Sequence, residues 1–131
     1  MVDGAGLIRK LQLKPGQRLR LMNAPGPLAA ALRAGGATVA ADGRCEAVLA
    51  FCGSPEEVET ACGQALAALE PDGLLWFAYR KGAAAKASGL SRDVGWSVLG
   101  RAGYRGVRSI AIDEDWTGLR FRETAKVKAG R

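Results

Sequence analysis

The chain has 131 residues, of which 48% are hydrophobic and 24% are charged, and its net charge is +6. A chain of this length and composition fits one globular domain with a core of its own. It contains no histidine, which excludes serine–histidine and cysteine–histidine catalytic pairs and most zinc sites.

The basic excess is confined to the C-terminal part of the chain. Residues 1–79 hold 7 lysines and arginines against 8 acidic residues, whereas residues 80–131 hold 12 against 5. This distribution predicts one basic end of the domain. Such an end is typical of a solvated strand face with a basic tail, or of a surface that binds a polyanion.

The cysteines and the apolar runs indicate a cytoplasmic protein. Cys45, Cys52 and Cys62 have no metal-binding spacing, so we expect free thiols in a reducing compartment. No apolar run approaches the ~20 residues needed to span a bilayer, and the N-terminus lacks the features of a signal peptide. We therefore expect no membrane partner.

The first half of the chain alternates helical and strand patterns. Pro27 can occupy the first turn of a helix, where its missing N–H costs nothing. Residues 47–51, AVLAF, form a continuous apolar run, as expected of a central strand buried on both faces. The expected elements are a helix over 5–12, a strand over 18–23, a helix over 28–33, and strands over 37–41 and 47–51.

The second half begins with the clearest helix signal. Ser54 can cap a helix, a proline follows at the first position, and Glu57 can close a capping box. Ser91 is expected to cap a later helix, and period-two alternation near the end predicts an antiparallel strand pair with one partly wet face. The expected elements are a helix from 55 to about 69, a strand over 74–79, a low-complexity segment over 80–89, a helix over 92–102, and strands over 107–112 and 119–122.

This order of elements predicts the fold class. Strands that alternate with helices, followed by an antiparallel pair, indicate a three-layer Rossmann-like α/β sandwich around a mostly parallel sheet. We expect a single domain over residues 1–123 and a basic, disordered tail over residues 124–131.

Several segments resemble class I methyltransferases that use S-adenosylmethionine. Residues 13–19, LKPGQRL, resemble the lead-in to the first motif of that family, and residues 68–75, ALEPDGLL, resemble the turn before a late strand. Residues 102–104, AGY, resemble the turn before its terminal hairpin. Residues 112–121, IDEDWTGLRF, are similar to the ending of a family of small bacterial proteins of unknown function. The resemblance implies a shortened methyltransferase-like fold.

The cofactor loop departs from the methyltransferase pattern. By register, the acidic residue of the family motif falls on Leu21. Its glycines fall on Asn23, Pro25 and Pro27. Proline fixes φ and has no N–H to donate, so this backbone is not expected to cradle the cofactor. The short link 42–44 also replaces about one strand–helix unit, which in the family helps to form the adenine pocket. We therefore expect neither adenosylmethionine nor another cofactor or metal.

Polar side chains are expected where the strands end, because ligands of open α/β sheets bind beyond the carboxyl ends of the strands. The candidate lining of a ligand cleft is Asn23, Cys52, Ser54, Arg80 and Lys81. The first three have structural interpretations as a turn residue, a buried thiol and a helix cap. The two cations, with Lys86, form either an anion clamp or a solvated loop.

The broken motif favours a non-catalytic domain that binds a protein partner or a small ligand, and no catalytic residue is assigned. Trp116, between acidic residues at the hairpin bend, is a candidate partner contact or a core side chain. One alternative is a divergent transferase that uses the strand-end cleft. Another is weak nucleic-acid binding through the basic strands and tail, with the residues Arg105, Arg108, Arg120, Arg122, Lys126, Lys128 and Arg131.

Overall fold

The computed structural model describes residues 3–82 and 87–127. Its strands are β1 (Arg18–Met22), β2 (Thr38–Val39), β3 (Cys45–Phe51), β4 (Leu69–Arg80), β5 (Tyr104–Ala111) and β6 (Trp116–Glu123). Its helices are α1 (Gly4–Lys10), α2 (Gly26–Ala34), α3 (Pro55–Ala68) and α5 (Ser97–Arg101), followed by a 3₁₀ turn, η1 (Thr124–Lys126).

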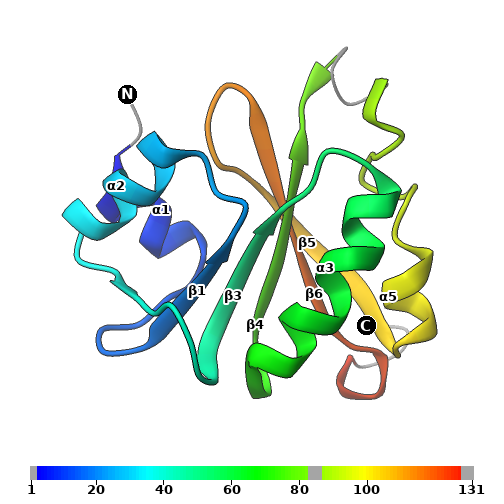
Figure 1. The fold of residues 1–131 in the computed structure, drawn as a ribbon, viewed down its shortest axis with the longest axis horizontal. Helices are drawn as coiled ribbons and strands as arrows, with labels where there is room; N and C mark the ends of the chain where they lie inside the picture. Colours follow the sequence, from blue (N-terminus) through cyan, green and yellow to red (C-terminus); the bar gives the residue numbers. More distant parts are fainter. Residues whose placement is uncertain (1–2, 83–86, 128–131) are drawn as a thin grey trace.

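The strands form one sheet with helices on both faces (Figure 1). In the described part of the chain the sheet has six strands in the order β2-β1-β3-β4-β6-β5. Strands β1 to β4 run parallel, and β6 is antiparallel to both β4 and β5. The predicted three-layer α/β sandwich, with a mostly parallel sheet and a closing antiparallel pair, is confirmed.

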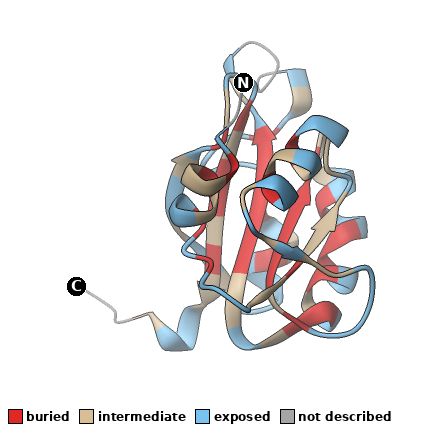
Figure 2. Cartoon of the chain, turned by 90° about the vertical axis from the view of Figure 1, so that its left-hand side faces the viewer, coloured by how far each residue is buried: buried red, intermediate tan, exposed pale blue. Residues whose placement is uncertain are grey.

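The two helix layers cover separate hydrophobic clusters. Along β3, Val48 and Ala50 belong to the cluster under α3 and α5. Leu49 and Phe51 belong to the cluster under α1 and α2. Figure 2 shows the buried residues concentrated on the central strands, with exposed residues on the outer helix faces. This explains the continuous apolar run in the sequence, because a strand covered on both faces has no wet side.

The start of α3 follows the sequence signal. Ser54 Oγ accepts the backbone N–H of Glu57 at 3.2 Å, and Glu57 Oε1 accepts the backbone N–H of Gly53 at 2.9 Å. The first bond satisfies a donor that the first turn of a helix leaves free, so the predicted Ser54 cap is confirmed. The second differs from the predicted capping box, in which Glu57 would accept the Ser54 N–H, because Glu57 reaches one residue further back, to Gly53.

The helix after the low-complexity segment begins later than predicted. The sequence predicted residues 92–102 with Ser91 as the cap, but α5 begins at Ser97. Gly95 has φ of +100°, which is incompatible with an α-helix, and a Cβ there would clash with Leu90. The carbonyl of Ser91 instead accepts the indole N–H of Trp96 at 2.7 Å, so Ser91 fixes a loop rather than a helix.

The ends of the sheet also differ from the expected bounds. Strand β2 is only two residues long, and β4 begins at Leu69 rather than at 74. After β6, η1 lies against the turn that precedes β5, because the Thr124 N–H donates to the Gly103 carbonyl at 2.8 Å. Residues 128–131, with the predicted tail cations Lys128 and Arg131, lie outside the described residues, as does Lys86. Within the described residues, no helix is long and apolar enough to cross a membrane.

Candidate functional site

The loop between β1 and α2 serves to start the helix. Asn23 is exposed and has φ of +56°, a left-handed conformation that asparagine tolerates in turns. The Pro25 carbonyl accepts the N–H groups of Leu28 and Ala29, each at 3.1 Å. Pro27, in the first turn, has no N–H. The beginning of α2 therefore offers few free donors to a phosphate or a carboxylate.

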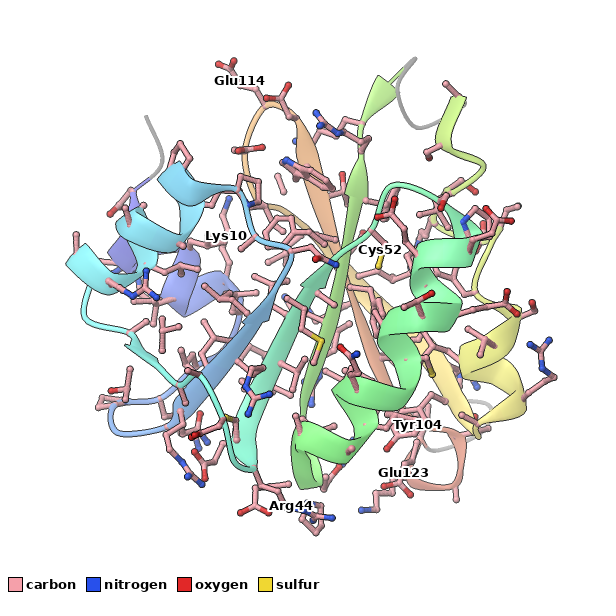
Figure 3. The ribbon with its side chains drawn as sticks, in the orientation of Figure 1. Lys10, Arg44, Cys52, Tyr104, Glu114 and Glu123 are labelled. Atoms are coloured by element: carbon pink, nitrogen blue, oxygen red, sulfur yellow. The ribbon has the colours of Figure 1, made fainter. Side chains whose placement is uncertain are left out.

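The two polar candidates that follow β3 have structural surroundings. The Cys52 side chain is 0% exposed, and burial, with a smaller effect of the Glu57 carboxylate, raises its pKa to about 12. The thiol is therefore protonated at neutral pH, whereas nucleophilic catalysis requires the thiolate. Figure 3 shows Cys52 between β3 and α3, inside the molecule. Ser54 is engaged as the N-cap of α3.

The candidates that follow β4 contact the hairpin β5–β6. The Arg80 Cζ lies 4.5 Å from the ring centroid of Trp116, a cation–π contact. Trp116 is 8% exposed, and its ring meets Phe51 edge-to-face with centroids 5.0 Å apart. The Lys81 N–H donates to the Asp115 carbonyl at 3.0 Å. The strand end is thus tied to the β5–β6 turn, and most of the Trp116 indole is inside the core.

A groove lies beside the contact between Lys81 and the β5–β6 turn, and it is bordered by α1, α2 and that turn. Its volume is about 740 Å³, within the usual range of small-molecule sites. We call it the α1–hairpin groove. Its floor is mainly apolar, with Leu7, Leu28 and Ile112 among the lining residues. Its charged lining residues are Asp3, Lys10, Lys81, Asp113, Glu114 and Asp115.

Two sets of hydrogen bonds hold the walls of the groove. Lys10 Nζ donates to the Ala111 carbonyl at 3.0 Å and so joins α1 to the end of β5. Asp113 Oδ1 accepts the N–H groups of Asp115 and Trp116 at 2.8 and 2.9 Å, which fixes the turn. Figure 3 shows Glu114 at the tip of this turn and labels Lys10, the last residue of α1. The first of these bonds connects the two walls directly.

The close packing of α1 on α2 sets the other side of the groove. A Cβ at Gly4 would clash with the Ala31 carbonyl oxygen, and one at Gly35 would lie 2.5 Å from the Ala5 nitrogen. Glycine at these two positions lets the helices approach closely. The lining residues Leu7, Pro27 and Leu28 are thereby held in place.

The groove carries a negative lining on a positively charged protein. Four acidic and two basic residues line it, while the whole chain has a net charge of +6. Among the described residues, no group of three or more His, Cys, Asp or Glu side chains is placed to hold a metal ion. The arrangement is suited to hold a positively charged or zwitterionic molecule over an apolar floor.

Of the predicted cleft residues, Lys81 lines the groove and Asn23, Cys52, Ser54 and Arg80 do not. The lining comes from the N-terminal helix, α2 and the hairpin turn, which are far apart in the sequence. The acidic run at 113–115 was the visible signal, but only the packing of α1 against the end of the hairpin places it beside Asp3.

We compared the chain with known protein families, curated proteins and solved structures. No protein-family model matches the chain, and no curated protein matches it. Solved structures do resemble it. The ribosomal protein L11 methylase from Lactobacillus delbrueckii subsp. bulgaricus aligns with 92% of this chain and 76% of its own length, with a TM-score of 0.59 and 12% identity.

Two further structures align with this chain over nearly their whole length. The N-methyltransferase NodS from Bradyrhizobium japonicum WM9 aligns with 92% of this chain and 93% of its own, with a TM-score of 0.55 and 16% identity. A SAM-dependent methyltransferase from Aquifex aeolicus aligns with 93% and 90%, with a TM-score of 0.55 and 12% identity. The fold is methyltransferase-like. At these identities, the methyltransferase-like fold is what the comparisons establish, and activity must be argued from the site.

Proposed function

We propose that this chain is a non-catalytic, methyltransferase-like domain that binds a small, positively charged or zwitterionic ligand in the α1–hairpin groove. The observation that carries the proposal is the pairing of an acidic lining with an apolar floor at the carboxyl ends of the strands. That edge is where open α/β sheets bind ligands. The apolar floor would hold the body of the ligand, and the carboxylates would hold its cation.

The β1–α2 loop supports the non-catalytic part of the proposal. With Pro25 and Pro27 in place of glycines, and the Leu28 N–H already bonded within the loop, little backbone is left to hold adenosylmethionine. Cys52 is buried and protonated, so it is not available as the nucleophile of a divergent transferase, because such catalysis needs an accessible thiolate beside a base.

The exposed surface favours a small ligand over a protein partner. Among the described residues, Val94 is the large hydrophobic side chain that stands exposed, at 60%. Protein interfaces usually bury a cluster of apolar or aromatic anchors, which a single valine does not provide. A cytoplasmic location remains part of the proposal, because Cys45, Cys52 and Cys62 are free and suit a reducing compartment.

Calorimetric titration tests both parts of the proposal. Agmatine, a small cation with an apolar chain, is the probe, and citrate is the anionic comparison. We expect agmatine to bind and citrate not to bind. In the double variant Glu114→Gln/Asp115→Asn agmatine should bind about tenfold more weakly, since each surface charge contributes up to about 1 kcal/mol.

The matched control is Glu56→Gln/Glu59→Gln, which removes two carboxylates from α3, in the opposite helix layer. This variant should bind agmatine like the wild type. Equal loss in both variants, or no agmatine binding by the wild type, would contradict the groove. Titration with S-adenosylhomocysteine should give no heat of binding at micromolar concentrations, and binding there would overturn the non-catalytic assignment.

A further inference from the structure

Four arginines lie on one face of the β5–β6 hairpin, in two directly opposed pairs. Arg105 lies opposite Arg122, and Arg108 lies opposite Arg120. We call these four residues the arginine quartet. The sequence shows two basic strands, but it does not show that their arginines share a face.

A β-bulge places them together. Tyr104 packs against the cluster under α3 and α5, and a Cβ at Gly106 would touch Leu119 of the same cluster. Arg105, between them, therefore points to the other face of the sheet. The register then shifts between Gly106 and Arg108. The extra residue, Val107, returns Arg108 to the same face as Arg105.

The protein neutralises this face only in part. Arg122 contacts both oxygens of Asp72 at 3.4 Å, and Asp72 is shared with Lys126 at 4.0 Å. Arg120 Nη1 donates to Gln12 Oε1 at 2.8 Å, while its Nε is buried without a hydrogen-bond partner. Burial, with repulsion from Arg122 and Arg108, lowers the pKa of Arg120.

The other two arginines have no such partner. Arg105 and Arg108 are exposed, and their guanidinium groups make no hydrogen bond or ion pair with another described residue. Directly opposed like charges destabilise a strand pair. A molecule that supplied negative charge along the hairpin would remove this repulsion and satisfy the free guanidinium groups.

The side chains on this face indicate which class of molecule it could bind. Trp76, on the same side of the sheet, is 0% exposed, and Tyr104 and Phe121 belong to the cluster on the opposite side. The face therefore offers no aromatic ring for stacking single-stranded bases and no apolar anchor for a protein partner. It offers planar guanidinium forks, which match phosphate oxygens.

We propose that the arginine quartet is a docking surface for the phosphate backbone of a nucleic-acid duplex. The two pairs lie about 7 Å apart along the hairpin, since two register positions separate them. Each pair would face one phosphate group or two neighbouring ones, without reading base sequence. This surface is separate from the α1–hairpin groove, whose acidic lining would repel a polyanion.

Fluorescence anisotropy with short mixed-sequence RNA and DNA duplexes tests the proposal. We expect binding at about 50 mM salt that weakens as salt rises, with a slope of log affinity against log salt of about −3 to −4. The variant Arg105→Gln/Arg108→Gln should reduce the slope by about 2 units and weaken binding at low salt at least tenfold. Both side chains are exposed, and an unchanged thermal unfolding curve verifies that the variant is folded.

The matched control is Arg33→Gln/Arg101→Gln, which removes the same charge from α2 and α5. It should keep the wild-type slope. The proposal is overturned by absence of duplex binding at low salt, by equal losses in the two double variants, or by tighter binding of a single strand of equal length. Stronger competition by polyglutamate of equal charge would also overturn it, in favour of an acidic protein partner. None of these outcomes bears on agmatine binding in the groove.

Discussion

At the scale of single residues, the buried thiol of Cys52 is not available as a nucleophile at the strand-end edge. Its side chain is 0% exposed, and the thiols of Cys45 and Cys62 are buried as well. We expect iodoacetamide at pH 8 to leave all three cysteines unmodified in the native protein and to modify all three after unfolding in urea. Mass spectrometry of the intact chain measures the modification.

The variant Ser109→Cys is the control, because residue 109 is exposed on β5 and a thiol there should react within minutes. Rapid native modification of Cys52 would show that the edge opens, and would restore the residue as a reactive candidate.

Residue identities alone predicted part of this site. Ser54 as a cap followed from its neighbours Pro55 and Glu57, because capping is a local interaction. The surroundings of Cys52 and Trp116 depend on long-range packing. A tryptophan between acidic residues is equally consistent with a surface contact. Only its edge-to-face contact with Phe51 and the position of Arg80 over its ring show that Trp116 belongs to the core.

At the scale of secondary structure, α3 depends on its serine cap. The variant Ser54→Ala removes the oxygen that accepts the Glu57 N–H at 3.2 Å. We expect the free energy of unfolding to fall by about 1 kcal/mol, the usual cost of losing a serine cap. Urea denaturation monitored by circular dichroism measures it.

Ser109→Ala, an exposed serine on β5, should change the same quantity by less than about 0.5 kcal/mol. If the two alanine variants were equally stable, the first turn of α3 would not need its side-chain cap.

The features that could not be predicted from the sequence depend on a glycine with positive φ and on the pairing register of β5 with β6. Ser91 looked like a helix cap, but Gly95 adopts a positive φ and turns the chain before α5 begins. Alternation of side chains predicted a strand over 107–112, which overlaps most of β5 (Tyr104–Ala111). It did not predict the bulge at Val107, because a bulge depends on pairing with β6. The arginine quartet was therefore visible only in the folded hairpin.

At the scale of the whole molecule, the ion pair between Arg18 and Glu46 contributes to a dependence of stability on pH. Glu46 in β3 accepts the Arg18 backbone N–H at 2.7 Å and lies 3.2 Å from the Arg18 guanidinium. These hydrogen bonds, the backbone one first, lower the pKa of Glu46 from 4.5 to about 2. A carboxylate with a lowered pKa stabilises the fold above its unfolded pKa, and the contribution disappears as the pH falls to the folded one.

We therefore expect the urea midpoint to fall between about pH 4.5 and 2, and Glu46→Gln to flatten the fall. Glutamine can still accept the Arg18 N–H, so the variant should fold. The control, Glu56→Gln, removes an exposed carboxylate from α3 and should retain the acid dependence. Parallel profiles for Glu46→Gln and the wild type would assign the acid sensitivity to other groups.

The bulge in β5 also affects how copies of the protein meet. Strand β5 is the last strand of the sheet, so its outer row of N–H and C=O groups has no strand beside it. Such an edge is a template for intermolecular β-pairing, and a regular, apolar one leads to aggregation. The bulge between Gly106 and Arg108 interrupts the regular spacing of these groups, and the exposed arginines repel a second copy. The feature that collects positive charge on one face thus also protects the protein from self-association at high concentration.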